Sequence, residues 1–348
     1  MDAAHADNRR GIMSERLSPA ESLSERPLPP QGHISVLQEA SIGLLAPAPG
    51  TLLLDGTFGG GGHTRALLNA SAPDGRVLAL DADPDAIARG AALHAEFGDR
   101  LGLRHANFAA MTEASAAVGW QPGTIATILL DLGLSSFQLS DAERGFSFMH
   151  AGPLDMRFDT TSGTTAAEIV NTWDETALAD LFWAYGEEPA SRRVARQITQ
   201  RRATRPYETT LQLADTVVGA KGGRRGRIHP ATQVFQALRI AVNDEVGALE
   251  RALIAARDLL RPGGRLAVIS FHSLEDRAVK LFFRREASAT EPDMLPRSVP
   301  VQPLARVPSL RILTPRPVVP TPAEIAANPR ARSAKLRVAE KRVPDGGA

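Results

Sequence analysis

Cysteine is absent from the 348 residues, and so is any apolar run of the roughly 18 residues that a membrane-spanning helix needs. Without cysteine the protein can form neither disulfides nor thiolate metal sites, which fits a reducing compartment. The N-terminus also lacks the hydrophobic core of a signal peptide. The sequence therefore predicts a cytoplasmic protein with no bound metal and no membrane partner.

The net charge of +1 is small, but the charge is unevenly distributed along the chain. The segment from Arg192 to Arg239 holds eleven Lys and Arg against two acids, so it carries +9 and the remainder carries −8. Charge runs are usually solvated helix faces. A cationic segment of this density instead indicates a nucleic-acid partner.

The stretch Leu52–His63 reads LLLDGTFGGGGH. Its three leucines, ending at Asp55, predict a parallel strand buried on both faces, because the run is apolar without alternation. The four glycines Gly59–Gly62 would let the backbone approach a ligand closely. The helix expected from His63 would then present free N–H groups to an anion. A merely flexible glycine loop is the less favoured alternative.

Strands and helices alternate along most of the chain, with strands predicted over 51–55, 76–81, 101–108, 124–131 and 265–271. Such alternation is typical of a doubly wound α/β fold with a mostly parallel sheet and sites at the carboxyl ends of the strands. Short strands at 309–314 and 334–340 would close the sheet, one of them antiparallel.

The alternation stops between the fourth and fifth strands, where helical patterns such as 175–185 and 191–202 replace it. We therefore predict a helical insertion at this point. The expected organisation is a disordered leader over 1–31, an α/β domain made of 32–140 and 241–348, and a basic substrate-recognition insertion over 141–240.

Carboxylates end two of the predicted strands. Asp81 closes the second strand about 26 residues after Asp55, where nucleotide-binding folds place an acid on ribose hydroxyls. Asp83 is the alternative, and Asp81 is favoured as the last residue of the apolar run. Asp131 closes the fourth strand, where a buried carboxylate is costly, so binding or catalysis is favoured over packing.

Two cofactors are compatible with this pattern. A nicotinamide dinucleotide favours Gly-x-Gly-x-x-Gly, but Thr64 occupies the third place after Gly59 and Gly61. S-adenosylmethionine needs no pyrophosphate cradle, and its ribose could lie on Asp81 with its adenine near Phe108. Packing in the core is the alternative for Phe108. S-adenosylmethionine is the favoured cofactor.

Longer motifs lead to a family. They are DGTFGGGGH (55–63), LDLGLSS (130–136), DAERGFSF (141–148), GPLDMR (152–157), HPAT (229–232), FQALR (235–239), SFHSLEDR (270–277) and NPRARS (328–333). Together they resemble the bacterial 16S rRNA (cytosine-N4)-methyltransferases, the RsmH or MraW family, from about residue 33 to 340. Phe137 is a departure, because a proline is common there in the family.

This resemblance implies a Rossmann-like class I methyltransferase fold and the use of S-adenosylmethionine to methylate N4 of cytosine C1402 in the decoding region of small-subunit 16S rRNA. By motif, the cofactor-binding residues would be Gly61, Gly62, His63, Asp81, Phe108, Asp131 and Gln138. The cytosine amine is a poor nucleophile because its lone pair is delocalised, so catalysis by positioning and electrostatics is expected.

Asp131 would orient this amine, hold the amino group of the cofactor, or do both. Ser270 and His272, at the end of the fifth strand, are second candidates for the substrate pocket, although a structural role fits His272 equally well. Trp183 and Tyr207 are predicted to stack on bases. Phosphate contacts are predicted for Arg192, Arg193, Arg201, Arg202, Arg224 and Arg225.

The predicted partner is 16S rRNA within the small ribosomal subunit or its precursor, and the oligomeric state is left open, with a homodimer as one alternative. Two other classes of function compete. A non-catalytic ribosome-assembly factor is disfavoured by the intact Asp81 and Asp131. A methyltransferase or dehydrogenase of small molecules is disfavoured by the cationic segment.

Overall fold

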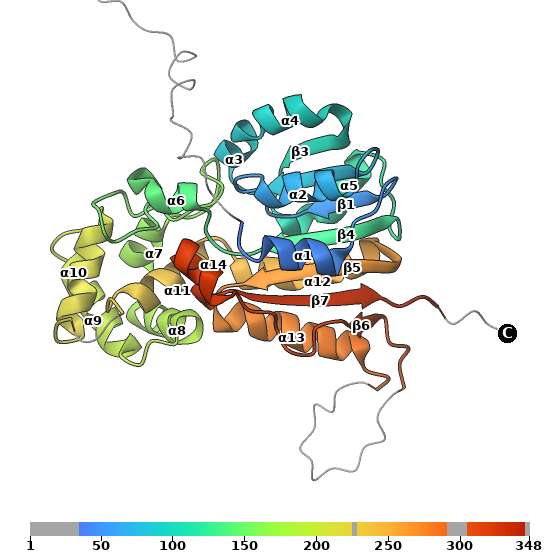
Figure 1. The fold of residues 1–348 in the computed structure, drawn as a ribbon. Coiled ribbons are helices and arrows are strands. Elements are labelled where there is room, and N and C mark those ends of the chain that lie inside the picture. The colour runs from blue at the N-terminus through green and yellow to red at the C-terminus, as the bar shows by residue number, and fades with distance from the viewer. Residues whose placement is uncertain (1–34, 225–227, 291–304, 345–348) are drawn as a thin grey trace, which may run out of the picture. The chain divides into compact units, whose positions relative to one another are not determined.

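The computed structural model describes residues 35–224, 228–290 and 305–344, and a seven-stranded sheet lies at its centre (Figure 1). In chain order the strands are β1 (Leu52–Asp55), β2 (Arg76–Asp81), β3 (Leu101–His105), β4 (Ile125–Asp131), β5 (Leu260–Ser270), β6 (Leu310–Ile312) and β7 (Lys335–Lys341). Across the sheet the order is β3-β2-β1-β4-β5-β7-β6. β1 to β5 are parallel, and β7 is antiparallel to both of its neighbours. The predicted fold class is confirmed.

Helices cover both faces of the sheet (Figure 1). They are α1 (Gln38–Leu45), α2 (Gly62–Ala70), α3 (Pro84–Arg89), α4 (Ala91–Phe97), α5 (Met111–Ala117), α12 (Glu245–Leu259) and α13 (Ser273–Ala287), with the short α14 (Pro322–Ala327) before β7. On β1, Leu53 packs into the core under α1 and α2, whereas Leu54 packs on the opposite side with α12 and α13. Burial on both faces explains why the strand is uniformly apolar.

The strand order reverses between β1 and β4, which are direct neighbours. Asp55 is paired in register with Leu129, so β1 and β4 end close together at the carboxyl edge of the sheet. In open α/β sheets this reversal leaves a crevice where ligands bind. The glycine turn after β1 and Asp131 at the end of β4 both lie at this point.

Two strand boundaries differ from the prediction. β3 ends at His105 rather than at 108, because the Asn107 side chain accepts the N–H of Ala109 (2.8 Å) and caps a 3₁₀ helix that begins at Phe108. β5 begins at Leu260 rather than at 265, and the Pro-Gly-Gly sequence forms an irregularity in its pairing with β4. A helix terminator in the sequence is therefore a bulge inside a strand.

The segment between β4 and β5 is helical, as predicted (Figure 1). Its helices are α6 (Ser136–Ser140), α7 (Ala166–Thr172), α8 (Glu175–Gly186), α9 (Ser191–Arg202), α10 (Thr210–Ala220) and α11 (Thr232–Val242). They enclose an apolar core of their own that includes Phe182, Ile198 and Leu238. No helix in the described ranges is both long enough and apolar enough to cross a membrane. The predicted leader over 1–31 lies outside the described residues.

Candidate active site

The glycine turn connects β1 to α2 with a backbone that only glycine tolerates well. Gly59 and Gly61 have φ of 53° and 77°, in the left-handed region. A Cβ on Gly61 would lie 2.9 Å from the Phe58 ring, so a side chain there would also clash. The Gly59 N–H donates to Asp81 Oδ2 (2.7 Å), which joins the turn to the end of β2.

Asp55 stabilises this turn through hydrogen bonds with its carboxylate. It is fully buried, with one oxygen accepting the N–H of Thr57 (3.0 Å) and the other accepting the hydroxyl of Thr64 in α2 (2.6 Å). Burial raises the pKa of Asp55, while these hydrogen bonds oppose the rise. Asp55 is thus a structural anchor between β1 and α2.

Asp131 and His63 face each other beside the turn. Asp131 Oδ2 lies 3.5 Å from His63 Nε2, and the Asp131 N–H donates to Thr57 Oγ1 (2.7 Å). Asp131 Oδ1 is buried without a hydrogen-bond partner among the described residues. Burial lowers the pKa of His63, but the carboxylates of Asp131 and Asp55 outweigh it and raise the pKa overall. The orphaned oxygen of Asp131 is an acceptor placed for a donor from a ligand.

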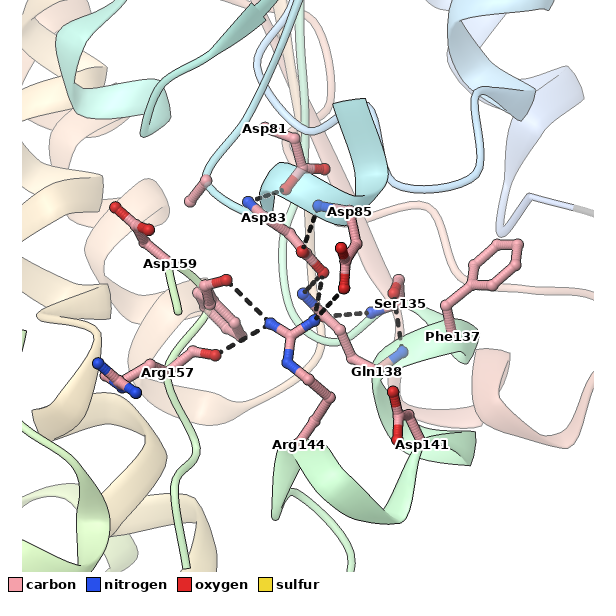
Figure 2. Close-up of polar contacts among 12 residues, drawn as sticks. Asp81, Asp83, Asp85, Ser135, Phe137, Gln138, Asp141, Arg144, Arg157 and Asp159 are labelled. Carbon is pink, nitrogen blue, oxygen red and sulfur yellow. Dashed lines mark hydrogen bonds and ion pairs between the residues drawn. The ribbon is translucent and has the colours of Figure 1, made fainter. Parts of the chain in front are cut away.

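Asp81 presents its carboxylate at the neighbouring strand end. Besides Gly59, it accepts the N–H of Asp83 at Oδ1 (2.8 Å; Figure 2). Burial raises the pKa of Asp81 to about 6, although the two backbone hydrogen bonds act in the opposite direction. No side chain of the described residues donates a hydrogen bond to Asp81, so its remaining acceptor capacity is available to a ligand.

Asp83, the alternative to Asp81, is occupied inside the protein (Figure 2). It caps α3 by accepting the N–H of Asp85, and its Oδ2 accepts from Gln138 Nε2 (3.0 Å) and Arg144 Nη1 (2.9 Å). The side chain of Asp83 is 1% exposed and that of Arg144 is 9% exposed. This buried ion pair favours Asp81 over Asp83 as the carboxylate that meets a ligand.

Arg144 is a residue that sequence reasoning missed. Its Nη2 donates to the carbonyl oxygens of Arg157 (3.1 Å) and Phe158 (2.9 Å), so one guanidinium joins the β2–α3 turn to the insertion (Figure 2). Gln138 belongs to the same cluster, because its Nε2 donates to Asp83. Its Oε1 accepts the Ser135 N–H (3.0 Å). The sequence signal that points to Arg144 is the motif 141–148, in which it lies.

Phe108 and Phe137 line the neighbourhood of the turn. Phe108 is half-buried, and its Cβ lies 3.0 Å from where a Cβ on Gly56 would be, so the base of its side chain lies against the end of β1. Phe137 lies near Gly60, and the guanidinium of Arg89 stacks 4.2 Å from the centre of its ring. This cation–π contact gives Phe137 a packing role where proline is common in the family.

Ser270 and His272 both have partners inside the protein, and their place in the substrate pocket stays a prediction. Ser270 is buried and its hydroxyl donates to the Lys335 carbonyl of β7 (3.4 Å). His272 caps α13 and lies 3.1 Å from Glu275. Glu245 is close enough to complete a three-ligand cluster, but Arg239 already binds both of its oxygens (2.6 and 2.8 Å). The cluster is a buried ion-pair network.

The predicted RNA-binding residues divide into two groups. Arg192, Arg193 and Arg224 are exposed, and Arg225 lies outside the described residues. Arg201 donates to the Gln212 carbonyl and to Thr216 Oγ1 (2.7 Å), and Arg202 donates to the Val170 carbonyl (2.7 Å). Their guanidinium groups connect helices of the insertion, and the prediction that they also bind phosphate stays a prediction.

The prediction for Tyr207 is wrong. Its side chain is 2% exposed and its hydroxyl donates to Thr216 Oγ1 (3.0 Å), so no base can stack on it. Trp183, in contrast, is 63% exposed.

The sequence is similar to known proteins over nearly the whole chain. A family model described as the MraW methylase family covers residues 30–342. The chain belongs to this family. Membership confirms the predicted family and enzyme class, a methyltransferase whose methyl donor is S-adenosylmethionine.

Three relatives within the MraW family are all called ribosomal RNA small subunit methyltransferase H. The protein of Thermomicrobium roseum is 56% identical over 314 residues, which cover 90% of this chain and 95% of that protein. The protein of Magnetococcus marinus is 51% identical over 89% of this chain and 98% of its own length. The protein of Geotalea uraniireducens is 49% identical over 89% and 98%.

Proposed function

We propose that this chain, acting in the cytoplasm, transfers a methyl group from S-adenosylmethionine to N4 of a cytosine, C1402, in the decoding region of small-subunit 16S rRNA. The relatives named for small-subunit ribosomal RNA support the substrate class. One observation supports an amine as the group that receives the methyl: Oδ1 of Asp131, beside the glycine turn, is buried and has no hydrogen-bond partner among the described residues. An amine N–H is the donor that such an oxygen lacks.

The donors and acceptors at the strand ends fit S-adenosylmethionine. The carboxylate of Asp81 would accept ribose hydroxyls, and the half-buried face of Phe108 would lie against the adenine. The turn at Gly61 and Gly62, with the N–H groups that open α2 at His63, would hold the amino-acid end. Gln138 would act through Asp83. When bound, the cofactor supplies an electrophilic methyl group on a sulfonium.

Asp131 and His63 would have different roles at the cytosine amine. His63 Nε2 lies 3.5 Å from Oδ2 of the carboxylate and, when protonated, would attract this oxygen and so orient the carboxylate. Oδ1 is then free to accept an N–H of the cytosine amine, which favours a pyramidal nitrogen with its lone pair directed at the methyl group. The same oxygen can take the proton that the nitrogen loses after it is methylated. Asp131 would thus serve in positioning and in proton removal.

A direct test uses the purified chain and small-subunit particles from a strain that lacks this methylation. We expect S-adenosylmethionine-dependent formation of N4-methylcytidine at a single position, measured by mass spectrometry of digested rRNA. A methylated base other than cytosine, or methylation of cytosine at carbon, would contradict the proposal.

Cofactor affinity should depend on pH through Asp81. Its pKa is about 6 in the folded chain against an ordinary value of 3.8, so the folded state binds this proton more tightly, and the stability that the proton contributes is lost as pH rises from about 4 to about 6. Ribose hydroxyls need the ionised acceptor, so calorimetry should show affinity falling about tenfold per unit below pH 6. Asp81→Asn should bind more weakly with a flat profile over this range. An unchanged profile in Asp81→Asn would contradict the role.

The remaining predictions about organisation are consistent with this function. We propose 32–140 and 241–348 as the methyltransferase domain and 141–240 as the RNA-recognition insertion. Arg192, Arg193 and Arg224 are the exposed arginines of the insertion that we propose for phosphate contact, with Arg225 beside them in the sequence. The homodimer stays a prediction.

A further inference from the structure

We propose that a single-stranded segment of the substrate RNA docks in a groove between α8 and the start of α9, with one base stacked on Trp183 and the adjoining phosphates on Arg192 and Arg193. The proposal rests on the proposed function, because it takes RNA as the substrate. It adds a binding site on the insertion, separate from the strand ends where the methyl group is transferred.

The groove is large and exposes an aromatic ring. It has a volume of about 740 Å³ and is lined by Trp183 of α8 and by Pro189, Arg192 and Arg193 at the start of α9. The Trp183 side chain is 63% exposed, whereas Trp120 is 6% exposed in the core of the α/β domain. A largely solvated indole contributes little to folding, but it offers a flat face on which a base can stack.

The charges beside the ring are available for a ligand. Arg192 and Arg193 are exposed, and neither side chain has a hydrogen bond or ion pair with another described residue. The next arginine of α9, Arg196, already lies 3.5 Å from Glu175. Two unpaired guanidinium groups next to an exposed indole form the combination that binds single-stranded nucleic acid, since arginine pairs with phosphate and the ring stacks on a base.

The groove also has one acid, Asp180, on the helix turn before Trp183. Its charge opposes a phosphate close to it, so the backbone of the RNA would run along the arginines on the α9 side. The RNA would therefore enter the groove from the α9 side, with its base on the indole. Neutralising Asp180 should then tighten the binding of RNA.

The end of α8 that follows Trp183 contacts the start of α13. Trp183 lies one helical turn before Glu187, whose Oε2 accepts the Ser273 hydroxyl at the start of α13 (3.4 Å). α13 follows β5 directly, so this end of α8 lies beside the carboxyl end of β5, the strand next to β4 in the sheet.

The test uses the full-length chain, a labelled RNA fragment of the decoding region, and fluorescence anisotropy over a range of salt concentrations. Trp183→Ala should weaken binding about 5- to 150-fold, the range for loss of one stacked base, and Trp183→Phe should recover most of it. Arg192→Ala/Arg193→Ala should lower the slope of log affinity against log salt by about 1.4, or about 0.7 for each phosphate contact. Asp180→Asn should bind more tightly at low salt.

Arg205→Ala is the matched control, because Arg205 is an exposed arginine of the same insertion outside the groove. It should bind like the wild type. The proposal is overturned if Trp183→Ala and the double arginine variant bind RNA like the wild type, or if Arg205→Ala weakens binding as much as they do. Neither of these binding measurements depends on methyl transfer. A wild-type protein that binds RNA through the groove but forms no N4-methylcytidine would contradict the proposed function and leave this site intact.

Discussion

Asp131→Asn is expected to slow methyl transfer by about two to four orders of magnitude, the range for a positioned group that handles a proton. Asparagine keeps the shape of the side chain and one acceptor oxygen, but it loses the negative charge that orients the amine and accepts its proton. Single-turnover rates at saturating cofactor measure the effect. The prediction is motivated by Oδ1 of Asp131, which is buried without a hydrogen-bond partner among the described residues.

The same variant separates the two roles that the sequence leaves open for Asp131. A slow rate with unchanged affinity for S-adenosylmethionine assigns the carboxylate to the cytosine amine. A loss of affinity in calorimetry assigns it to the amino group of the cofactor. Asp99→Asn, which changes an exposed acid outside the site, should react like the wild type. A wild-type rate for Asp131→Asn would remove this residue from the chemistry.

The sheet and its carboxylates could be predicted from the sequence because one physical signal fixes both. A strand buried on both faces is apolar throughout, so the strands Leu52–Asp55 and Ile125–Asp131 can be recognised in the sequence. The acid that ends each apolar run marks the end of the strand. The prediction was wrong where local chemistry interrupts a run, as at Asn107, whose side chain caps the next turn and ends β3 early.

The arginines could not be assigned from the sequence, because charge alone does not say what a guanidinium contacts. Arg201 and Arg193 lie in one helix and carry the same charge, yet Arg201 donates to a carbonyl of α10 and stacks 4.8 Å from the centre of the Tyr207 ring, while Arg193 is exposed. Arginine satisfies buried carbonyl oxygens well. A cationic segment therefore contains exposed arginines that can bind a ligand and arginines that pack within the protein. Only the packing distinguishes the two kinds.

Arg144→Leu is expected to lower the free energy of unfolding by about 3–5 kcal/mol, because it leaves the carboxylate of Asp83 buried without its partner. Both side chains of the pair are almost fully buried, 9% and 1% exposed. Two carbonyl oxygens of the insertion would lose their donor as well. Urea unfolding measures the change. Affinity for S-adenosylmethionine should fall in parallel, since Asp83 N–H is one of the two backbone donors that hold Asp81.

A second substitution shows whether the unpaired charge is the cause. Asp83→Asn added to Arg144→Leu should recover part of the lost stability, because an amide costs less to bury than a carboxylate and still caps α3. Arg157→Ala is the control: its pair with Asp155 is more exposed, at 21% for each side chain, and should contribute about 1 kcal/mol or less. If Arg144→Leu unfolds at the same urea concentration as Arg157→Ala, then the pair with Asp83 does not hold the β2–α3 turn, and the position of Asp81 must depend on the glycine turn alone.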